Sequence, residues 1–226
     1  MKKHPLAIAI DGPSGAGKST IARRLAGDLH FIYVDTGALY RAVGYTVLRR
    51  GIEPGDAAAV ETCLPGLRVT LRYVEGEQRV FVDDEDVSDR IRTPEVSMAA
   101  SAVSALPAVR RFLLQLQRDM AASGDVIMDG RDIGTVVLPE AGLKIFLTAS
   151  PEERARRRFL ELREKGTDTT LEAVLADMRK RDHDDSSRAA APLKAAEDAV
   201  LVDTTGLTLE EAVSRLKKLA KERIEA

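Results

Sequence analysis

The 226 residues contain little that could cross-link the chain or hold it in a membrane. Cys63 is the only cysteine, so no disulfide can form within the chain; we expect a reducing compartment and an ordinary small side chain at this position. No apolar run approaches the roughly 20 residues of a membrane span. Removal of a leader peptide would also take away the first predicted strand. We therefore expect a cytoplasmic protein without a membrane partner.

The chain also lacks an excess of either charge. Lys and Arg number 34 and Asp and Glu number 36, which gives a net charge of −2, and we expect no nucleic-acid partner. Asparagine is absent, and with it the N-K-x-D element of guanine-specific switch proteins. Hydrophobic residues make up 44%, which argues against disorder. The length suits one α/β core with small insertions, and we expect a monomer.

The most specific pattern is GPSGAGKS at residues 12–19, which fits the phosphate-binding loop G-x-x-x-x-G-K-[ST]. An apolar run at residues 6–10 predicts a buried strand before it. Apolar residues at helical spacing in 20–29 predict a helix after it. Strand, glycine-rich loop and helix thus come in the order that the motif requires, which a chance glycine-rich turn would not explain.

This loop predicts a site for the phosphates of a nucleoside triphosphate. Gly12, Gly15 and Gly17 allow positive φ and a close approach of backbone N–H groups to the ligand. Lys18 would reach the β- and γ-phosphates, and the Ser19 hydroxyl would bind Mg²⁺. The residues expected to bind ATP are Gly12, Pro13, Ser14, Gly15, Ala16, Gly17, Lys18, Ser19 and Thr20.

The rest of the chain alternates between strand and helix patterns, which predicts a parallel sheet of about five strands wrapped by helices. The further apolar runs lie at residues 31–34, 126–128, 143–147 and 200–202. Helix starts are predicted where a hydroxyl residue precedes proline or stands three residues before glutamate, at Thr93, Ser150, Thr169 and Thr208.

One segment departs from this pattern. Around residues 69–82, apolar and polar residues alternate on both sides of a turn, which predicts an antiparallel hairpin with one solvated face. We interpret residues 63–93 as an antiparallel insertion into an α/β core formed by residues 1–62 and 94–226.

Arginines are dense between about residues 152 and 188, on two predicted helices around Gly166. Arginines on a helix are usually solvated, and their ion pairs contribute little to the free energy of unfolding. We instead interpret this region as a helical, arginine-rich lid that closes over transferring phosphates and excludes water. The arginines considered are Arg154, Arg157, Arg158, Arg181 and Arg188.

Two further clusters follow predicted strands, where a doubly wound sheet binds its ligands. In DTGALYR, residues 35–41, a hydroxyl and an arginine at a helix start either form a second anion site or are a capped helix with a solvated arginine. In DGRDIGT, residues 129–135, Asp129 ends an apolar strand, as an acid that holds Mg²⁺ or its water shell does. Arg131 is a candidate phosphate ligand there; a solvated loop is the alternative.

Together, GPSGAGKST, DTGALYR, DGRDIGTVV, and RDHDDSSR followed by APL resemble the bacterial cytidylate kinase family. The resemblance extends from Ala7 to the last predicted helix. It implies a P-loop kinase that transfers the γ-phosphoryl group of ATP to CMP or dCMP with Mg²⁺. It also implies that the hairpin insertion is the nucleoside-monophosphate-binding domain of that family.

The resemblance implies roles for individual residues. For the acceptor nucleotide, it places Ser101, Arg110 and Asp132 at cytosine and Arg181 and Asp185 at ribose. It places Thr36, Arg41 and Arg131 at the phosphate and Arg188 at base or phosphate, and it includes Tyr40 in the same site. The expected catalytic groups are Lys18, Arg131, Arg154 and Arg158, and the expected metal ligands are Ser19 and Asp129. The family often has serine where Thr36 stands, and the hydroxyl is preserved.

The chemistry of Asp132 supports this assignment. A carboxylate accepts a hydrogen bond from the exocyclic amine of cytosine, whereas uracil presents a carbonyl oxygen that a carboxylate repels. Two alternatives remain: a P-loop kinase for another small acceptor, such as thymidylate or a shikimate-like acid, and a nucleotide-gated switch. A sugar-like acid has no evident use for Asp132 with Ser101 and Arg110, and a guanine-specific switch would need the missing asparagine element.

Overall fold

The computed structural model describes residues 5–75, 77–164 and 166–225. The chain divides into two compact units. We call residues 1–34 with 120–226 the sheet unit and residues 35–119 the hairpin unit. Among the described residues, no helix has the length and apolarity needed to cross a bilayer.

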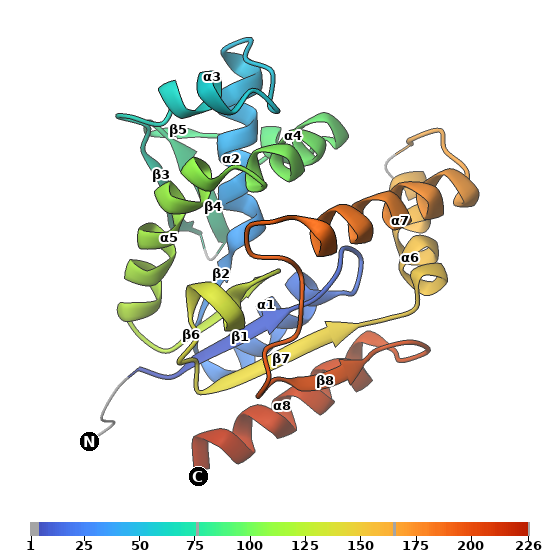
Figure 1. The fold of residues 1–226 in the computed structure, drawn as a ribbon. Helices are drawn as coiled ribbons and strands as arrows, with labels where there is room; N and C mark the ends of the chain where they lie inside the picture. The colour runs from blue at the N-terminus through green and yellow to red at the C-terminus, as the bar shows by residue number, and fades with distance from the viewer. Residues whose placement is uncertain (1–4, 76, 165, 226) are drawn as a thin grey trace. The chain divides into compact units, whose positions relative to one another are not determined.

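The predicted five-stranded parallel sheet is confirmed, with β1 in the middle (Figure 1). The strand order is β2 (Ile32–Asp35), β6 (Val126–Gly130), β1 (Ala7–Asp11), β7 (Leu143–Thr148) and β8 (Val200–Asp203). In the parallel register of β1, Ile10 lies opposite Asp129 of β6 and Ile145 of β7. The carboxyl end of β1 therefore lies beside those of β6 and β7, and the glycine-rich loop follows directly from it.

The helices that cover this sheet have apolar residues at helical spacing. These residues form one apolar face on each helix, and that face packs on the sheet. The sheet unit contains α1 (Lys18–Leu29), α6 (Pro151–Glu164), α7 (Leu171–Ser187) and α8 (Leu209–Glu225). Helices α1 and α8 pack against each other and share one core with the strands, in which Leu25 and Leu216 are fully buried. Helices α6 and α7 form the predicted helical pair and have a small core of their own around Ala155, Val174 and Met178.

Most predicted helix starts are confirmed by capping bonds. In α8, Glu211 N donates to Thr208 Oγ1 and Thr208 N donates to the Glu211 carboxylate, a reciprocal capping box. The start predicted at Thr169 is wrong by one residue: Thr170 is the cap of α7, and its hydroxyl accepts from Ala173 N. The cap requires only a backbone N–H three residues on, so the glutamate that suggested Thr169 is not needed.

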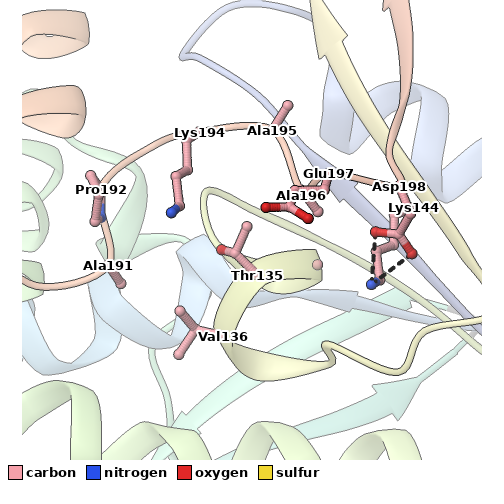
Figure 2. A pocket seen from close by; sticks show the side chains of 11 residues that line it. Thr135, Val136, Lys144, Ala191, Pro192, Lys194, Ala195, Ala196, Glu197 and Asp198 are labelled. Carbon is pink, nitrogen blue, oxygen red and sulfur yellow. Dashed lines mark hydrogen bonds and ion pairs between the residues drawn. The ribbon is translucent and has the colours of Figure 1, made fainter.

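One turn of the sheet unit is π-helical, η2 (Ile133–Val137), directly after β6. Together with residues 191–198 it borders a surface cavity of about 420 Å³ (Figure 2). Lys144, which lines the same cavity, forms an ion pair with Asp198. The charges in this cavity are mixed.

The hairpin unit combines helices with the predicted antiparallel strands. Its helices are α2 (Thr36–Arg49), α3 (Ala57–Thr62), the 3₁₀ turn η1 (Arg90–Arg92), α4 (Pro94–Ser104) and α5 (Pro107–Ala122). The antiparallel sheet has the order β3 (Val69–Val74), β4 (Glu77–Val82) and β5 (Glu85–Asp86), so a short third strand joins the predicted hairpin. Cys63 is buried in this unit. The insertion boundaries at residues 63 and 93 remain a prediction.

Packing of the sheet itself requires glycine at position 12. Gly12 has φ 148°, and a Cβ built there would lie 1.9 Å from the carbonyl oxygen of Leu147. We expect Gly12→Ala to lower the free energy of unfolding by about 3 kcal/mol or more, from backbone strain and overpacking together. Gly206→Ala is the control, because Gly206 has φ 73° with nothing within 4 Å, and strain alone should cost about 1–2 kcal/mol. Urea denaturation measures both, and equal losses would contradict the packing explanation.

Candidate active site

The glycine-rich loop has the backbone conformation that the sequence predicts. Gly12, Gly15 and Gly17 have φ of 148°, 74° and 89°. Gly15 also lies against α7, because a Cβ there would be 2.7 Å from Met178 Cε. Gly17 is the N-cap of α1, so the helix begins at Lys18. Backbone N–H groups and the positive end of the helix dipole thus follow the loop, which is the arrangement that binds phosphate.

Lys18 is buried at the start of α1, where its Nζ donates to the carbonyl oxygen of Pro13 at 2.7 Å. Burial, and next the positive charge of Arg131, lower the pKa of Lys18 well below its ordinary value; Asp129 and Asp11 oppose this shift. An anion bound in the loop would favour the charged amine. The position suits a lysine that neutralises phosphate charge.

Ser19 and Asp129 lie together, as the prediction of a metal site requires. Ser19 Oγ donates to Asp129 Oδ2 at 2.8 Å, and the Tyr33 hydroxyl donates to Asp129 Oδ1 at 2.9 Å. The described residues hold no group of three or more acidic, His or Cys side chains that could enclose a metal. Magnesium at phosphate sites uses one or two protein oxygens together with substrate phosphates and water, so this pair fits it.

Arg154 supports the phosphate loop from α6. It is buried, and its Nη1 donates to the Ser14 carbonyl oxygen at 3.0 Å. Its guanidinium also binds the Asp182 carboxylate through two bonds of 3.1 and 2.7 Å, and its Nε donates to the Ala149 carbonyl oxygen. The bidentate pair with Asp182 fixes the guanidinium plane. Arg158 instead pairs with Glu161 on its own helix, outside this set of contacts.

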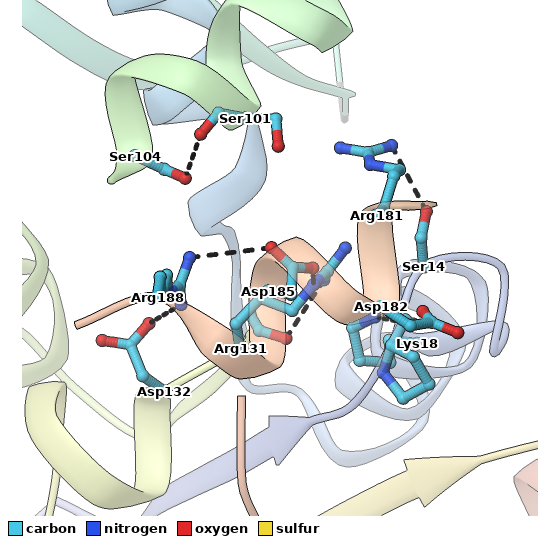
Figure 3. A network of polar contacts seen from close by, with 12 residues as sticks. Ser14, Lys18, Ser101, Ser104, Arg131, Asp132, Arg181, Asp182, Asp185 and Arg188 are labelled. Carbon is cyan, nitrogen blue, oxygen red and sulfur yellow. Dashed lines mark hydrogen bonds and ion pairs between the residues drawn. The ribbon is translucent and has the colours of Figure 1, made fainter. Parts of the chain in front are cut away.

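Four of the residues assigned to the acceptor form one network in the sheet unit (Figure 3). Asp185 accepts from Arg131 Nε at 2.8 Å, and Arg188 lies 3.7 Å from both Asp185 Oδ1 and Asp132 Oδ1. Burial alone would raise the pKa of the Asp185 carboxyl, but Arg131 and Arg188 bring it below its ordinary value. Arg181, one turn before Asp185 on α7, points to the loop, with its Nη1 3.5 Å from Ser14 Oγ (Figure 3).

Asp11 is a buried acid that the sequence analysis missed. It ends β1, and its two carboxylate oxygens accept from Ile133 N at 2.8 Å and Gly134 N at 2.7 Å. Burial raises the pKa of Asp11 to about 6, although both N–H bonds act to lower it. The rule that identified Asp129, an acid at the end of an apolar strand, applies equally to Asp11. Tyr33 gave no such signal, because it reads as an ordinary core residue of an apolar strand.

In the hairpin unit, the start of α2 holds an arginine in place. Asp35 caps the helix by accepting from Ala38 N at 2.9 Å, and its other oxygen accepts from Arg41 Nη2 at 2.9 Å. Thr36, the first residue of α2, is buried beside it. The Nε of Arg41 is buried and has no hydrogen-bond partner within the described part of the chain. An unsatisfied buried donor of this kind suits an anion.

The other predicted residues of the hairpin unit lie on α2, α4 and α5. The Arg110 guanidinium lies 5.8 Å from the centre of the Tyr40 ring, and its Nη1 donates to the Ser104 carbonyl oxygen at 3.1 Å. Ser104 Oγ in turn donates to the carbonyl oxygen of Ser101. Helix α2 approaches α4 closely at Gly44, where a Cβ would be 2.8 Å from Ala100 N. This close packing fixes α2 and α4 within the unit.

The sequence comparisons with known proteins agree on one family. The sequence model described as cytidylate kinase matches residues 8–222. A cytidylate kinase from Caldicellulosiruptor bescii is 52% identical over 219 residues, 97% of this chain and 96% of that protein. One from Desulfitobacterium hafniense is 52% identical over 225 residues, 100% of this chain and 96% of its own. The crystal structure of an uncharacterized protein from Eubacterium ventriosum shares the fold, with a TM-score of 0.55, 14% identity and coverage of 96% of this chain and 99% of that one. The chain belongs to the cytidylate kinase family.

Proposed function

We propose that the protein transfers the γ-phosphoryl group of ATP to the phosphate of CMP or dCMP, giving ADP and CDP or dCDP. The observation that carries this proposal is a phosphate loop of the required geometry in a chain that matches the cytidylate kinase family over residues 8–222. An oxygen of the acceptor phosphate attacks the γ-phosphorus, the bond to the β–γ bridging oxygen breaks, and ADP leaves. The attacking oxygen is already anionic, so no general base is needed, and catalysis consists of positioning and charge neutralisation.

The donor side is proposed to lie at the loop from Gly12 to Thr20. The loop amides bind the phosphates, and Lys18 neutralises charge on the β- and γ-phosphates. Ser19 and Asp129 would hold Mg²⁺, which when bound neutralises charge on the donor phosphates. Tyr33 would orient the Asp129 carboxylate through the bond to its second oxygen.

For the acceptor, residues of suitable chemistry occur in both units, and each unit is considered separately. In the hairpin unit, Thr36 and Arg41 are proposed to bind the acceptor phosphate; the buried Nε of Arg41 supports this. The remaining proposed contacts of this unit are those of Tyr40, Ser101 and Arg110. In the sheet unit, the proposed contacts are those of Arg131 with the phosphate, Arg181 and Asp185 with the ribose, Asp132 with the base, and Arg188 with base or phosphate.

The lid arginines divide into two roles under this proposal. Arg154 is engaged by the phosphate loop and Asp182, so it holds the loop in shape beside the phosphates. Arg158 is more exposed and paired only locally by Glu161, and it would reach the phosphates only if the lid closes. Lid closure and the insertion at residues 63–93 as the monophosphate-binding segment are parts of the same proposal.

The role of Lys18 can be tested by removing its charge. Lys18→Met keeps most of the apolar stem, and we expect kcat to fall about 10²–10³-fold, the usual loss for a preorganised group that stabilises transition-state charge. KM for CMP should change little, because Lys18 serves the donor. Lys217→Met is the control, since Lys217 pairs with Asp28 on the surface. Steady-state ADP release measures both variants, and an unchanged kcat in Lys18→Met would overturn the assignment.

The role of Asp132 can be tested by base selectivity. Asp132→Asn adds a donor where the carboxylate only accepts, so CMP loses its preferred contact and UMP loses its repulsion. The ratio of kcat/KM for CMP over UMP should fall by about 10- to 100-fold, the scale of 1–3 kcal/mol for one buried polar contact. Asp177→Asn, at an exposed position of α7, should leave the ratio unchanged. Equal loss of activity on both nucleotides in Asp132→Asn would instead assign Asp132 to the geometry of the loop.

A further inference from the structure

We propose that Asp11 is a positioning residue for acceptor selection, which holds the turn η2 so that the side chain of Asp132 is directed to the base. The inference depends on the proposed function, because it assumes that Asp132 reads the base. Asp11 lies one peptide bond before Gly12 of the phosphate loop, and its carboxylate bonds to the first two amides of η2. One side chain thus connects the end of β1 to the segment that carries Arg131 and Asp132.

The cap of η2 is the first observation. Asp132 occupies the N-cap position, where an aspartate ordinarily accepts from the amides of the turn that follows. Here Asp132 makes no side-chain capping bond, and Asp11 bonds to Ile133 N and Gly134 N in its place. The carboxylate of Asp132 is turned instead toward Arg188, 3.7 Å away (Figure 3). Capping from another strand releases Asp132 from the role that its position would otherwise give it.

The surroundings of η2 are the second observation. Its own backbone bonds run within the turn, from Val136 N to the Asp132 carbonyl oxygen and from Leu138 N to the Ile133 carbonyl oxygen. Gly134, Thr135 and Val136 of the turn also line the cavity of about 420 Å³ (Figure 2). The Thr135 hydroxyl oxygen is buried with no hydrogen-bond partner among residues 5–75, 77–164 and 166–225. Asp11 therefore bonds to β1 a turn that also borders a cavity and carries an unsatisfied hydroxyl.

The phosphate loop has supports that do not involve Asp11. Arg154 donates to the Ser14 carbonyl oxygen, and Lys18 donates to the Pro13 carbonyl oxygen. At Gly12 the backbone passes so near Leu147 that a Cβ would lie 1.9 Å from the Leu147 carbonyl oxygen. A change at Asp11 should therefore alter acceptor selection more than ATP binding.

Asp11→Asn tests the inference. The side-chain carbonyl oxygen of asparagine can still accept from one backbone N–H of η2, but its NH₂ group would face the second N–H, and two donors repel each other. We expect the ratio of kcat/KM for CMP over UMP to fall about 10-fold, the effect of one lost hydrogen bond to a charged group. KM for ATP should stay within about 2-fold, since the loop keeps its other supports and the bound phosphates favour the charged Lys18 amine in place of the lost Asp11 charge. In an Asp132→Asn background, adding Asp11→Asn should not change the ratio further, because both substitutions then act on the same contact.

Asp125→Asn is the matched control. The Asp125 carboxylate accepts from Leu6 N at 2.7 Å, so it joins the segments just before β1 and β6, at the end of the sheet away from η2. It should leave the ratio unchanged, and an equal fall in both variants would overturn the inference as a general effect of loosened strands. If Asp11→Asn does not fold, Asp11→Ser takes its place: the shorter hydroxyl cannot accept from both amides, so the ratio should fall in the same way.

The outcomes separate this inference from the proposed function. If Asp132→Asn lowers the ratio but Asp11→Asn leaves it unchanged, the positioning role is wrong and base reading by Asp132 stands. If Asp132→Asn itself leaves the ratio unchanged, base reading is wrong, and the role inferred for Asp11 is wrong with it.

Discussion

The structure depends on satisfying the charged side chains that are buried near the carboxyl ends of β1 and β6. Asp11, Lys18, Asp129 and Arg154 are each at most 6% exposed, and an unpaired charge in such a place would cost several kcal/mol. Each of them is bonded to a backbone group or to a side chain of opposite charge or hydroxyl type. The bonds that make this burial tolerable also fix the loops that carry the site.

Ion pairs between acids and arginines likewise fix the positions of side chains that the proposed function places near the substrate. Asp35 holds Arg41, Asp185 holds Arg131, and Asp182 holds Arg154. An arginine held in this way loses little rotamer freedom when a phosphate arrives, so less binding energy is lost to ordering it. Under the proposed function, the acids would therefore assist phosphate binding by holding the arginines in place, although none is expected to touch the phosphate itself.

The sequence was sufficient to predict what depends on local pattern. The parallel sheet, the antiparallel hairpin, the helical pair and the positive φ of Gly12, Gly15 and Gly17 follow from periodicity and from a motif whose glycines have a steric reason. Most caps were also predictable, and the exception, Thr170 in place of Thr169, arose where two adjacent threonines offer the same hydroxyl.

What sequence alone could not give are contacts between residues far apart in the chain. The bonds of Asp11 to η2 and of Tyr33 to Asp129 span 122 and 96 positions, and no local pattern encodes them. The division of the chain at residues 34 and 119 is equally a property of three-dimensional packing. Even so, the rule of acids at strand ends, applied evenly, would have identified Asp11.

The three loop glycines are not under the same selective pressure. A side chain at position 12 would run into the Leu147 carbonyl, whereas at position 17 the nearest atom to a Cβ, in Ile21, is 3.5 Å away. A descendant of this chain that had lost its chemistry would still need glycine at position 12 in order to fold, while position 17 would be restrained mainly by its backbone angle. Retention of the first glycine in a diverged relative would therefore indicate that the strands still pack as they do here, whereas the last glycine reports only the backbone angle at the start of α1.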